Sequence, residues 1–391
     1  MNYILFDSDV RNSLLPFTYT RPVAEIRIGI LTIREKWEFF LGFTTTTITE
    51  EYLEAKYPMV ELNENILINA SFLPTKNLVN QVRKLSKNQA IFQGEQIVAF
   101  FTSDTQENVD FDSYEQLEFQ EDLIQIKHTS DIFSLNDKAI QADFDLLTEG
   151  RTSQPIPSGV HAIHKQNIFI EEGATVSYSS LNASKGPIYI GKDSEIMEGC
   201  LVRGPFALGK NSILKMGTKA YGATTLGPHC KVGGEINNSA LFGYSSKGHE
   251  GFLGNSVLGE WCNIGADSNS SNLKNNYAEV KLWNYQEERF TKTGLQFCGL
   301  MMGDHSKCGI NTMFNTGTVV GVSANIFGSG FPRNFIPSFS WGGAAGFTIY
   351  QMKKVIEVAK VVMKRRDLEL SETDISILQH VFDKTSKFRA K

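Results

Sequence analysis

An aliphatic residue recurs every six positions through the middle of this 391-residue chain, and no other feature restricts its fold so strongly. Glycine often follows this anchor directly, and a small side chain often stands four positions after it. The anchors in phase are Ile190, Ile196, Val202, Leu208, Leu214, Leu226, Val232, Leu258, Ile264, Met302, Cys308, Phe314, Val320 and Ile326. A short fixed period is typical of a solenoid rather than of a single globular core.

The six-residue period has a simple physical explanation. Short strands joined by tight turns wind into a coil, in which each anchor points inward and stacks on the anchors of neighbouring coils. The second inward position is small because the coil is narrow. Cys200, Cys230 and Cys262 occupy that position, which predicts buried and inert thiols. We expect the coil to cover about 168–329.

The repeat breaks phase twice. The spacing between anchors exceeds a multiple of six by two residues before Leu258, and again before Met302. We therefore expect a loop to leave the coil at 236–252 and an arm-like strand pair to leave it at 272–297. Insertions in a rigid solenoid collect on one face and are common binding elements.

The segments on either side of the coil follow other patterns. Before it, strand-like runs at 3–6, 66–69, 90–92 and 97–101 alternate with helix-like runs at 23–41 and 75–85. This alternation predicts an α/β domain with a partly parallel sheet.

Three regions follow from these patterns, with a Pro- and Gly-containing boundary at 151–159. Residues 1–152 form the α/β domain, 153–336 the coil, and 337–391 a helical segment that caps the coil. In the helical segment, Ser371 and Asp374 are spaced as a capping pair for a short second helix.

Composition excludes several classes of protein. Lys+Arg 38 against Asp+Glu 43 gives a net charge of −5, so there is no electrostatic case for binding nucleic acid or a membrane surface. No apolar run reaches the ~18 residues of a membrane span, and the first residues lack the pattern of a signal peptide. Five cysteines without a short disulfide framework favour a reducing, cytoplasmic location.

Histidines are the candidate bases. His249 stands between glycines in the first expected loop, where a neutral imidazole is suited to take a proton from an amine. His305 is expected at an outward coil position. His161 and His164 have no metal-ligand spacing to other residues, so the sequence does not support a zinc site. From spacing alone, each is equally explained as a surface or core histidine.

Five short motifs stand together between 246 and 274. They are Gly248-His249, Phe252-Leu-Gly254, Leu258-Gly259, Asn263-Ile-Gly-Ala266 and Ser271-Asn-Leu-Lys274. This run closely resembles the acetyltransferase half of the bifunctional N-acetylglucosamine-1-phosphate uridyltransferase/glucosamine-1-phosphate N-acetyltransferase family. The archaeal-type members are similar also through Glu279-Val-Lys281 and Gly303-Asp-His305. The resemblance implies a left-handed parallel β-helix of hexapeptide repeats, assembled as a homotrimer with acetyl-CoA between neighbouring subunits.

Residue roles follow from the same resemblance. It implies that His249 is the general base and that Asn272 and Glu235 line the acceptor and sugar sites. The family commonly has Tyr where Phe252 stands, which removes a hydroxyl from the expected phosphate contact. Lysines of the family near the sugar phosphate are Asn237 and Ala278 here. The candidates to replace them are Lys247, Lys274 and Lys281. A different amino sugar therefore stays open as the acceptor.

The N-terminal domain resembles the nucleotidyltransferase half of the same family in a short, divergent form. Leu15-Pro-Phe-Thr18 and Arg21-Pro22 match its substrate loop, but the preceding phosphate cradle at 6–12 has no glycine. The resemblance implies that Arg11, Thr18 and Arg21 contact the nucleotide, with UTP as substrate and Mg²⁺ as its counter-ion. It does not identify the metal ligands.

Taken together, the sequence predicts an acetyltransferase acting on an amino-sugar 1-phosphate, coupled to a sugar-1-phosphate nucleotidyltransferase. Two alternatives stay open. The N-terminal domain is inactive in one, and in the other the whole chain is a non-catalytic hexapeptide scaffold or regulatory subunit.

Overall fold

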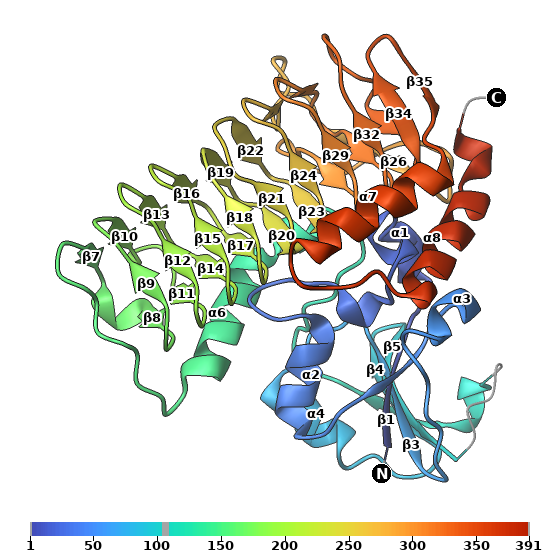
Figure 1. Ribbon diagram of the computed structural model, residues 1–391. Coiled ribbons are helices and arrows are strands. Elements are labelled where there is room, and N and C mark those ends of the chain that lie inside the picture. Colours follow the sequence, from blue (N-terminus) through green and yellow to red (C-terminus); the bar gives the residue numbers. More distant parts are fainter. Residues whose placement is uncertain (1, 104–108, 390–391) are drawn as a thin grey trace.

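The N-terminal domain is built on a mixed six-stranded sheet. The structure is a computed structural model that describes residues 2–103 and 109–389 (Figure 1). The strands lie in the order β2-β1-β3-β5-β4-β6, with β2 and β3 parallel to β1 and with β5 antiparallel to β3. Their bounds are β1 Asn2–Phe6, β2 Thr46–Ile48, β3 Asn65–Asn69, β4 Gln89–Gln93, β5 Gln96–Thr102 and β6 Glu115–Glu118. The predicted α/β domain with a partly parallel sheet is confirmed.

Helices cover this sheet and join it to the coil. They are α1 Val10–Ser13, α2 Ile33–Leu41, α3 Glu51–Glu54, α4 Lys76–Val82, α5 Asp131–Ser134 and α6 Asn136–Thr148. The helix expected at 23–41 is only half formed, because backbone amides before α2 are held by another element. Asn136 Oδ1 accepts from Gly29 N at 2.7 Å, and Asp143 Oδ2 accepts from Ile30 N at 2.7 Å. The α2 helix begins after Thr32, which closes a capping box with Glu35.

The middle of the chain is a parallel β-helix with three sheets, as predicted. The first coil sheet contains β7 His161–Ile163, β10 Ser180–Asn182, β13 Leu201–Arg203, β16 Lys219–Tyr221, β19 Glu235–Asn237, β22 Phe252–Gly254, β25 Asn269–Ser270 and β30 Met313–Phe314. The second contains β8 Ile168–Ile170, β11 Ile188–Ile190, β14 Phe206–Leu208, β17 Thr224–Leu226, β20 Ala240–Gly243, β23 Val257–Glu260, β28 Met301–Met302, β31 Val319–Val320 and β33 Phe335–Ile336.

The third coil sheet is the longest and closes with an antiparallel hairpin. It contains β9 Thr175–Val176, β12 Glu195–Ile196, β15 Ile213–Leu214, β18 Lys231–Val232, β21 Ser246–Lys247, β24 Asn263–Ile264, β29 Lys307–Cys308, β32 Asn325–Ile326, β34 Ser340–Gly343 and β35 Gly346–Ile349. The hairpin of β34 and β35 lies beyond residue 336 and continues the coil up to the helices.

The coil core is the stack of anchors that the period predicted. Anchors of successive coils are buried and paired in register, as Ile190, Leu208 and Leu226 are in the second coil sheet. Cys200, Cys230 and Cys262 are free and buried, and burial raises the pKa of each thiol. They therefore fill space and are not poised for redox chemistry.

The loop expected at 236–252 does not exist. The chain there forms β19, β20 and β21, which pair with the coils on both sides. The phase is lost because two successive coils are shorter than the regular 18 residues: the register advances by 15 residues from Leu226 to Leu241 and by 17 from Leu241 to Leu258. A shortened coil and an inserted loop disturb a six-residue count in the same way.

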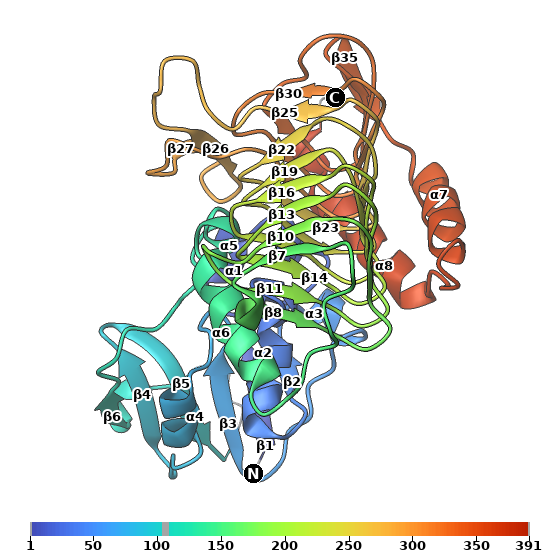
Figure 2. The ribbon, with the colours of Figure 1, turned by 90° about the vertical axis from the view of Figure 1, so that its left-hand side faces the viewer.

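The second excursion is confirmed as an antiparallel hairpin, which we call the arm. It consists of β26 Lys281–Asn284 and β27 Arg289–Lys292, and it stands out from the coil (Figure 2). Its apolar side chains pack back onto the rest of the chain: Trp283 stacks on Phe335 at 4.1 Å, and Tyr285 meets Tyr19 edge to face at 5.5 Å.

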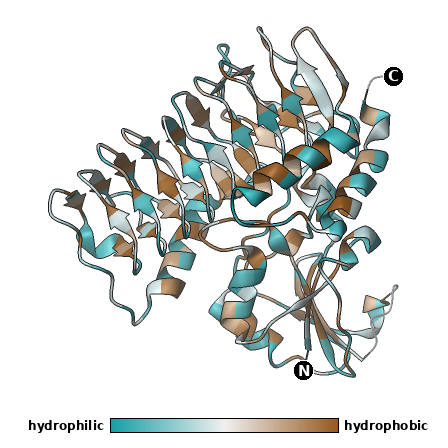
Figure 3. Cartoon of the chain, viewed as in Figure 1, coloured by the Kyte–Doolittle hydropathy of each residue, from teal (hydrophilic) through white to brown (hydrophobic). Residues whose placement is uncertain are grey.

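The C-terminal helices α7 Met352–Lys364 and α8 Glu372–Lys384 lie along the coil and beside the N-terminal domain (Figure 1). Hydrophilic and hydrophobic residues alternate on α7, as expected for a helix with one buried face (Figure 3). Ser371 and Asp374 form the predicted capping box of α8. Within the described residues, no helix is long and apolar enough to cross a bilayer.

The N-terminal domain and the C-terminal helices cover the coil unevenly. Outward side chains of the second coil sheet, among them Phe169 and Tyr189, are buried against the N-terminal domain through Phe144 of α6. The first coil sheet keeps exposed apolar side chains, with Ile163 53% and Leu201 55% accessible. The first coil sheet is therefore a face on which a ligand or another subunit can lie.

Candidate active site

The exposed first coil sheet carries three of the predicted acetyl-transfer residues. Glu235 and Asn237 belong to β19, and Phe252 begins the next strand, β22. The parallel register sets Glu235 beside Phe252 and Asn237 beside Gly254. All three side chains are half-buried, so they are held in place yet remain reachable from solvent.

Asn272 completes this group from one coil further on. A Cβ added to Gly254 would lie 2.5 Å from Phe252 Cζ and 2.7 Å from Asn272 Nδ2, so ring and amide meet above this glycine. Asn272 Nδ2 also donates to Asn255 Oδ1 at 2.7 Å, which fixes the direction of the amide. The absence of a side chain at Gly254 is what allows Phe252 and Asn272 to approach.

His249 lies at the corner between the third and first coil sheets. It is exposed and lies within the turn 248–251 that leads into β22. A Cβ on Gly234, which has φ +74°, would lie 2.8 Å from His249 O. Since Gly234 immediately precedes Glu235, the His249 corner rests against the start of β19, next to the group on the first coil sheet.

Lys247 supports the same corner from inside, a structural role that sequence reasoning missed when it considered this lysine as a contact to the sugar phosphate. Its side chain fills an aliphatic anchor position and is 1% exposed. The ammonium donates to Gly233 O and His249 O, both at 2.8 Å. Burial lowers the pKa of Lys247 to about 8. A lysine at an anchor position, two residues before His249, is the signal in the sequence that could have revealed it.

Lys281 lies apart from this group. It is exposed on β26 of the arm, and its carbonyl lies close to Gly317. Within residues 2–103 and 109–389, no hydrogen bond or ion pair joins it to Glu235, Phe252 or His249.

A cavity of 540 Å³ extends along the first coil sheet from β7 to β19. Glu235 lines one end, where it accepts a 2.5 Å hydrogen bond from Tyr221 OH. That hydrogen bond, more than burial, raises the pKa of Tyr221. Leu201 and Ile163 give the rest of the cavity an apolar wall. The group formed by Glu235, Phe252 and Asn272 therefore opens onto an apolar surface. This surface suits an apolar or aromatic ligand or a second subunit.

His305 is a poor second candidate for the base. It lies at a different coil corner, where its ring stacks with Trp261 at 6.2 Å. Burial lowers the pKa of His305 to about 3, so its imidazole is neutral and weakly basic at pH 7.

The N-terminal domain has its own cavity, of 700 Å³, at the carboxyl ends of β1 and β2. This is where parallel α/β sheets bind ligands. Asp7, Asp9, Arg11 and Glu50 are the charged residues of its lining, which therefore carries more acid than base. Thr18 and Arg21 are not part of the lining.

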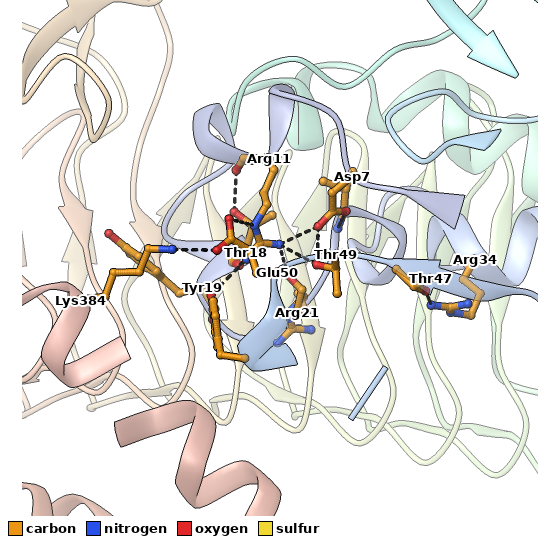
Figure 4. A network of polar contacts seen from close by, with 12 residues as sticks. Asp7, Arg11, Thr18, Tyr19, Arg21, Arg34, Thr47, Thr49, Glu50 and Lys384 are labelled. Atoms are coloured by element: carbon orange, nitrogen blue, oxygen red, sulfur yellow. Dashed lines mark hydrogen bonds and ion pairs between the residues drawn. The ribbon is translucent and has the colours of Figure 1, made fainter. Parts of the chain in front are cut away.

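Arg11 is already engaged by the protein (Figure 4). Its guanidinium forms an ion pair with Asp7 at 2.8 Å and donates to the carbonyls of Thr18 and Arg21. Thr18 is fully buried and donates its hydroxyl back to Arg11 O at 2.7 Å. Burial raises the pKa of Asp7, and Arg11 opposes that rise. A nucleotide phosphate would have to break these contacts to reach Arg11.

Arg21 belongs to a buried junction between the two halves of the chain. It pairs with Asp304 of the coil and lies 3.4 Å from Glu260, while Thr20 Oγ1 donates to Asp304 at 2.7 Å. Burial alone would raise the pKa of Asp304, but Arg21 holds it below the ordinary value. Arg21 therefore fastens the N-terminal domain to the coil.

The residues do not fit a resident Mg²⁺ site. No cluster of three metal-ligating side chains occurs among the residues that the structure describes. Asp7, the central carboxylate of the cavity, already accepts from Val23 N, Thr49 and Arg11. We therefore derive no step through a metal bound by this chain alone.

Comparison with known sequences supports the N-terminal assignment. Residues 3–152 match the sugar nucleotidyl transferase family. The chain is 33% identical over 145 residues to a bifunctional sugar-1-phosphate nucleotidylyltransferase/acetyltransferase of Sulfurisphaera tokodaii. That match spans 37% of this chain and 36% of the relative, so the chain matches about a third of the length of that protein.

Solved structures of low similarity align with part of the chain. The polySia-specific acetyltransferase NeuO matches with a TM-score of 0.26 and 12% identity, over 49% of this chain and 82% of its own. The Arabidopsis UDP-N-acetylglucosamine acyltransferase matches with a TM-score of 0.26 and 15% identity, over 60% of this chain and 99% of its own. Scores this low carry no argument about activity.

Proposed function

We propose that the chain is an enzyme of sugar-nucleotide synthesis whose coil transfers acetyl groups. The match of residues 3–152 to the sugar nucleotidyl transferase family supports the first part of this proposal. The donor is acetyl-CoA and the acceptor is the amine of glucosamine 1-phosphate or a close relative. If the N-terminal domain is also active, the final product is UDP-N-acetylglucosamine. The observation that carries the proposal is the convergence of Glu235, Phe252 and Asn272 on one exposed face, next to the His249 corner.

The proposed chemistry is an acyl transfer with general-base catalysis. The amine nitrogen attacks the thioester carbonyl, His249 accepts the proton, and the thiolate of CoA leaves from the tetrahedral intermediate. Glu235 orients the amino sugar, and Asn272 donates to the acyl or acceptor oxygens. Backbone N–H groups beside the His249 corner stabilise the oxyanion.

A homotrimer would complete this site. The first coil sheet has an apolar cavity wall and exposed side chains such as Leu201, which a second copy would bury on association. In this arrangement acetyl-CoA lies between neighbouring subunits, beside His249.

The second proposed activity, coupling of the sugar phosphate to UTP with Mg²⁺ as counter-ion, belongs to the N-terminal domain. A competing proposal is an N-terminal domain that no longer transfers nucleotides. Two observations favour that alternative: the guanidinium of Arg11 already has partners within the protein, and Arg21 joins the N-terminal domain to the coil. A non-catalytic scaffold is the remaining alternative, and it requires that acetyl-CoA does not bind.

One assay separates these three proposals. Thiol release from acetyl-CoA is measured with glucosamine 1-phosphate, after which UTP and Mg²⁺ are added and pyrophosphate is measured. We expect thiol release by the wild type, its loss in His249→Ala by a factor of about 10²–10⁴, and no change in the exposed control His164→Ala. Thiol release without pyrophosphate identifies the inactive N-terminal domain. If acetyl-CoA does not bind at all, the non-catalytic scaffold is the alternative that remains.

A further inference from the structure

A second polar cavity, which none of the proposed reactions uses, lies between the arm and the N-terminal domain. We call it the arm cavity; its volume is 210 Å³. Asn12 and Ser13 of α1 and the segment 128–130 line one side, and Trp283 and Tyr285 of the arm line the other. Ser13 Oγ donates to Gln286 Oε1 at 3.2 Å, which joins the two sides at the rim.

Two buried polar atoms of the arm lack partners there. Tyr285 is 6% exposed, and neither its hydroxyl nor the indole N–H of Trp283 has a hydrogen-bond partner among the described residues. Unpaired buried donors are rare because each loses its hydrogen bonds to water without replacement. Both rings are firmly held, since Trp283 stacks on Phe335 and Tyr285 packs at 5.4 Å from Phe388. Both residues line the cavity, and their packed rings cannot easily rotate.

The opposite wall offers further unused polar groups. The side chains of Asn12, Thr129 and Ser130 line the cavity, and none of them forms a hydrogen bond within the part of the chain that the structure describes. Thr129 and Ser130 are buried. Five uncommitted polar side chains from three segments far apart in the sequence therefore line one space, which is the arrangement expected around a polar ligand.

The charges beside the cavity are already compensated. Lys292 lies 3.5 Å from Glu279, and Glu287 pairs with Arg289. An anion or cation would therefore find no free counter-charge among these residues. The other polar groups of the lining are hydroxyls, the amides of Asn12 and Asn284, the imidazole of His128 and one indole N–H, which match alternating donors and acceptors of hydroxyl groups.

We propose that the arm cavity binds an uncharged, hydroxyl-rich ligand of about the size of one sugar ring, with Tyr285 and Trp283 as its buried hydrogen-bonding residues. Asn12 also lines the cavity at the ends of β1 and β2, so the ligand lies beside that cavity. The arm leaves the coil just after Asn272, so a ligand held here touches an element that begins at the acetyl-transfer face. Binding requires neither of the proposed reactions.

The test is calorimetric titration of the intact chain with glucose and with N-acetylglucosamine, with inorganic phosphate as the charged comparison. We expect saturable binding of at least one sugar and none of phosphate. Tyr285→Phe keeps the ring contacts and removes only the hydroxyl, so sugar binding should weaken by about five- to tenfold. The variant should unfold at the same temperature as the wild type or higher. Tyr178→Phe, at a side chain that is 73% exposed on the coil, is the matched control and should bind normally.

Three outcomes would overturn the proposal: no sugar binds, phosphate binds in place of sugar, or Tyr285→Phe binds sugar as tightly as the wild type. The first would mean that the cavity holds water alone. Because the readout is binding, a failure here leaves the acetyl-transfer proposal untouched, and a failure of acetyl transfer leaves this one intact.

Discussion

The acetyl-transfer face and the N-terminal cavity contrast in how their polar residues are used. On the first coil sheet, Glu235, Phe252 and Asn272 are accessible, and His249 is exposed beside them. At the N-terminal cavity, Arg11 is buried and hydrogen-bonded to its own loop. Arg21 lies outside the cavity lining and is paired with Asp304 of the coil. A family motif can thus stabilise a domain junction instead of binding a ligand. The predictions below challenge or refine this contrast.

The largest effect is expected from Arg21→Ala. The substitution leaves Asp304 buried without its counter-charge, and breaking a buried pair in this way costs about 3–5 kcal/mol of unfolding free energy. Denaturant unfolding of the whole chain measures it. The control is Arg289→Ala at a 73% exposed ion pair, which should cost less than about 0.5 kcal/mol. Equal stability of the two variants would show that Arg21 is not a structural residue.

A smaller effect is expected from Lys247→Met, which keeps an unbranched side chain at the anchor position but removes the bonds to Gly233 O and His249 O. The His249 corner loses its internal support, so acetyl transfer should fall by about tenfold, mainly in kcat. Lys247→Arg should restore part of the activity if a donor is what the corner needs. Full activity in Lys247→Met would show that Lys247 does not support the His249 corner.

The same lysine predicts a pH dependence of stability. The pKa of Lys247 is lowered by burial to about 8, below its value in the unfolded chain, so the unfolded state binds more protons between those two values. The free energy of unfolding of the wild type should therefore rise, relative to Lys247→Met, as the pH increases from 8 to about 10. Urea titrations of both proteins across this range measure the difference. A difference that stays constant or shrinks would mean that burial does not lower the pKa of Lys247 below its value in the unfolded chain.

The smallest effect is expected from Phe252→Tyr. The new hydroxyl sits beside Asn272 and Gly254, where one added hydrogen bond to the sugar phosphate is worth about 1 kcal/mol. KM for glucosamine 1-phosphate should fall by about fivefold with little change in kcat. An unchanged KM would place the phosphate elsewhere on the face and would support a different acceptor sugar.

Much of the fold could be predicted because its causes are local in sequence. The anchors and the small-residue positions repeat at a fixed spacing, and the capping pair Ser371 and Asp374 is a local signal. The features that were missed depend on partners far away. Arg21 meets Asp304 283 residues later, and the break in the helix expected at 23–41 depends on Asn136 and Asp143.

The candidate site follows the same rule. The register that sets Glu235 beside Phe252 follows from regular coils, so these neighbours could be anticipated from the resemblance. Counting in sixes failed at 236–252, because two successive shortened coils look like a loop and conceal that Lys247 points inward. The arm cavity needs three segments that only the folded chain brings together.

The central claim, that the coil face binds ligand while the N-terminal arginines serve as internal supports, is tested most directly by hydrogen–deuterium exchange of the intact chain. The exchange is followed with acetyl-CoA and, separately, with UTP and Mg²⁺. We predict that acetyl-CoA slows exchange around 246–254 and 269–273, and that neither ligand changes exchange in 7–21. Protection of 7–21 by UTP, with no protection of the His249 corner by acetyl-CoA, would contradict the account.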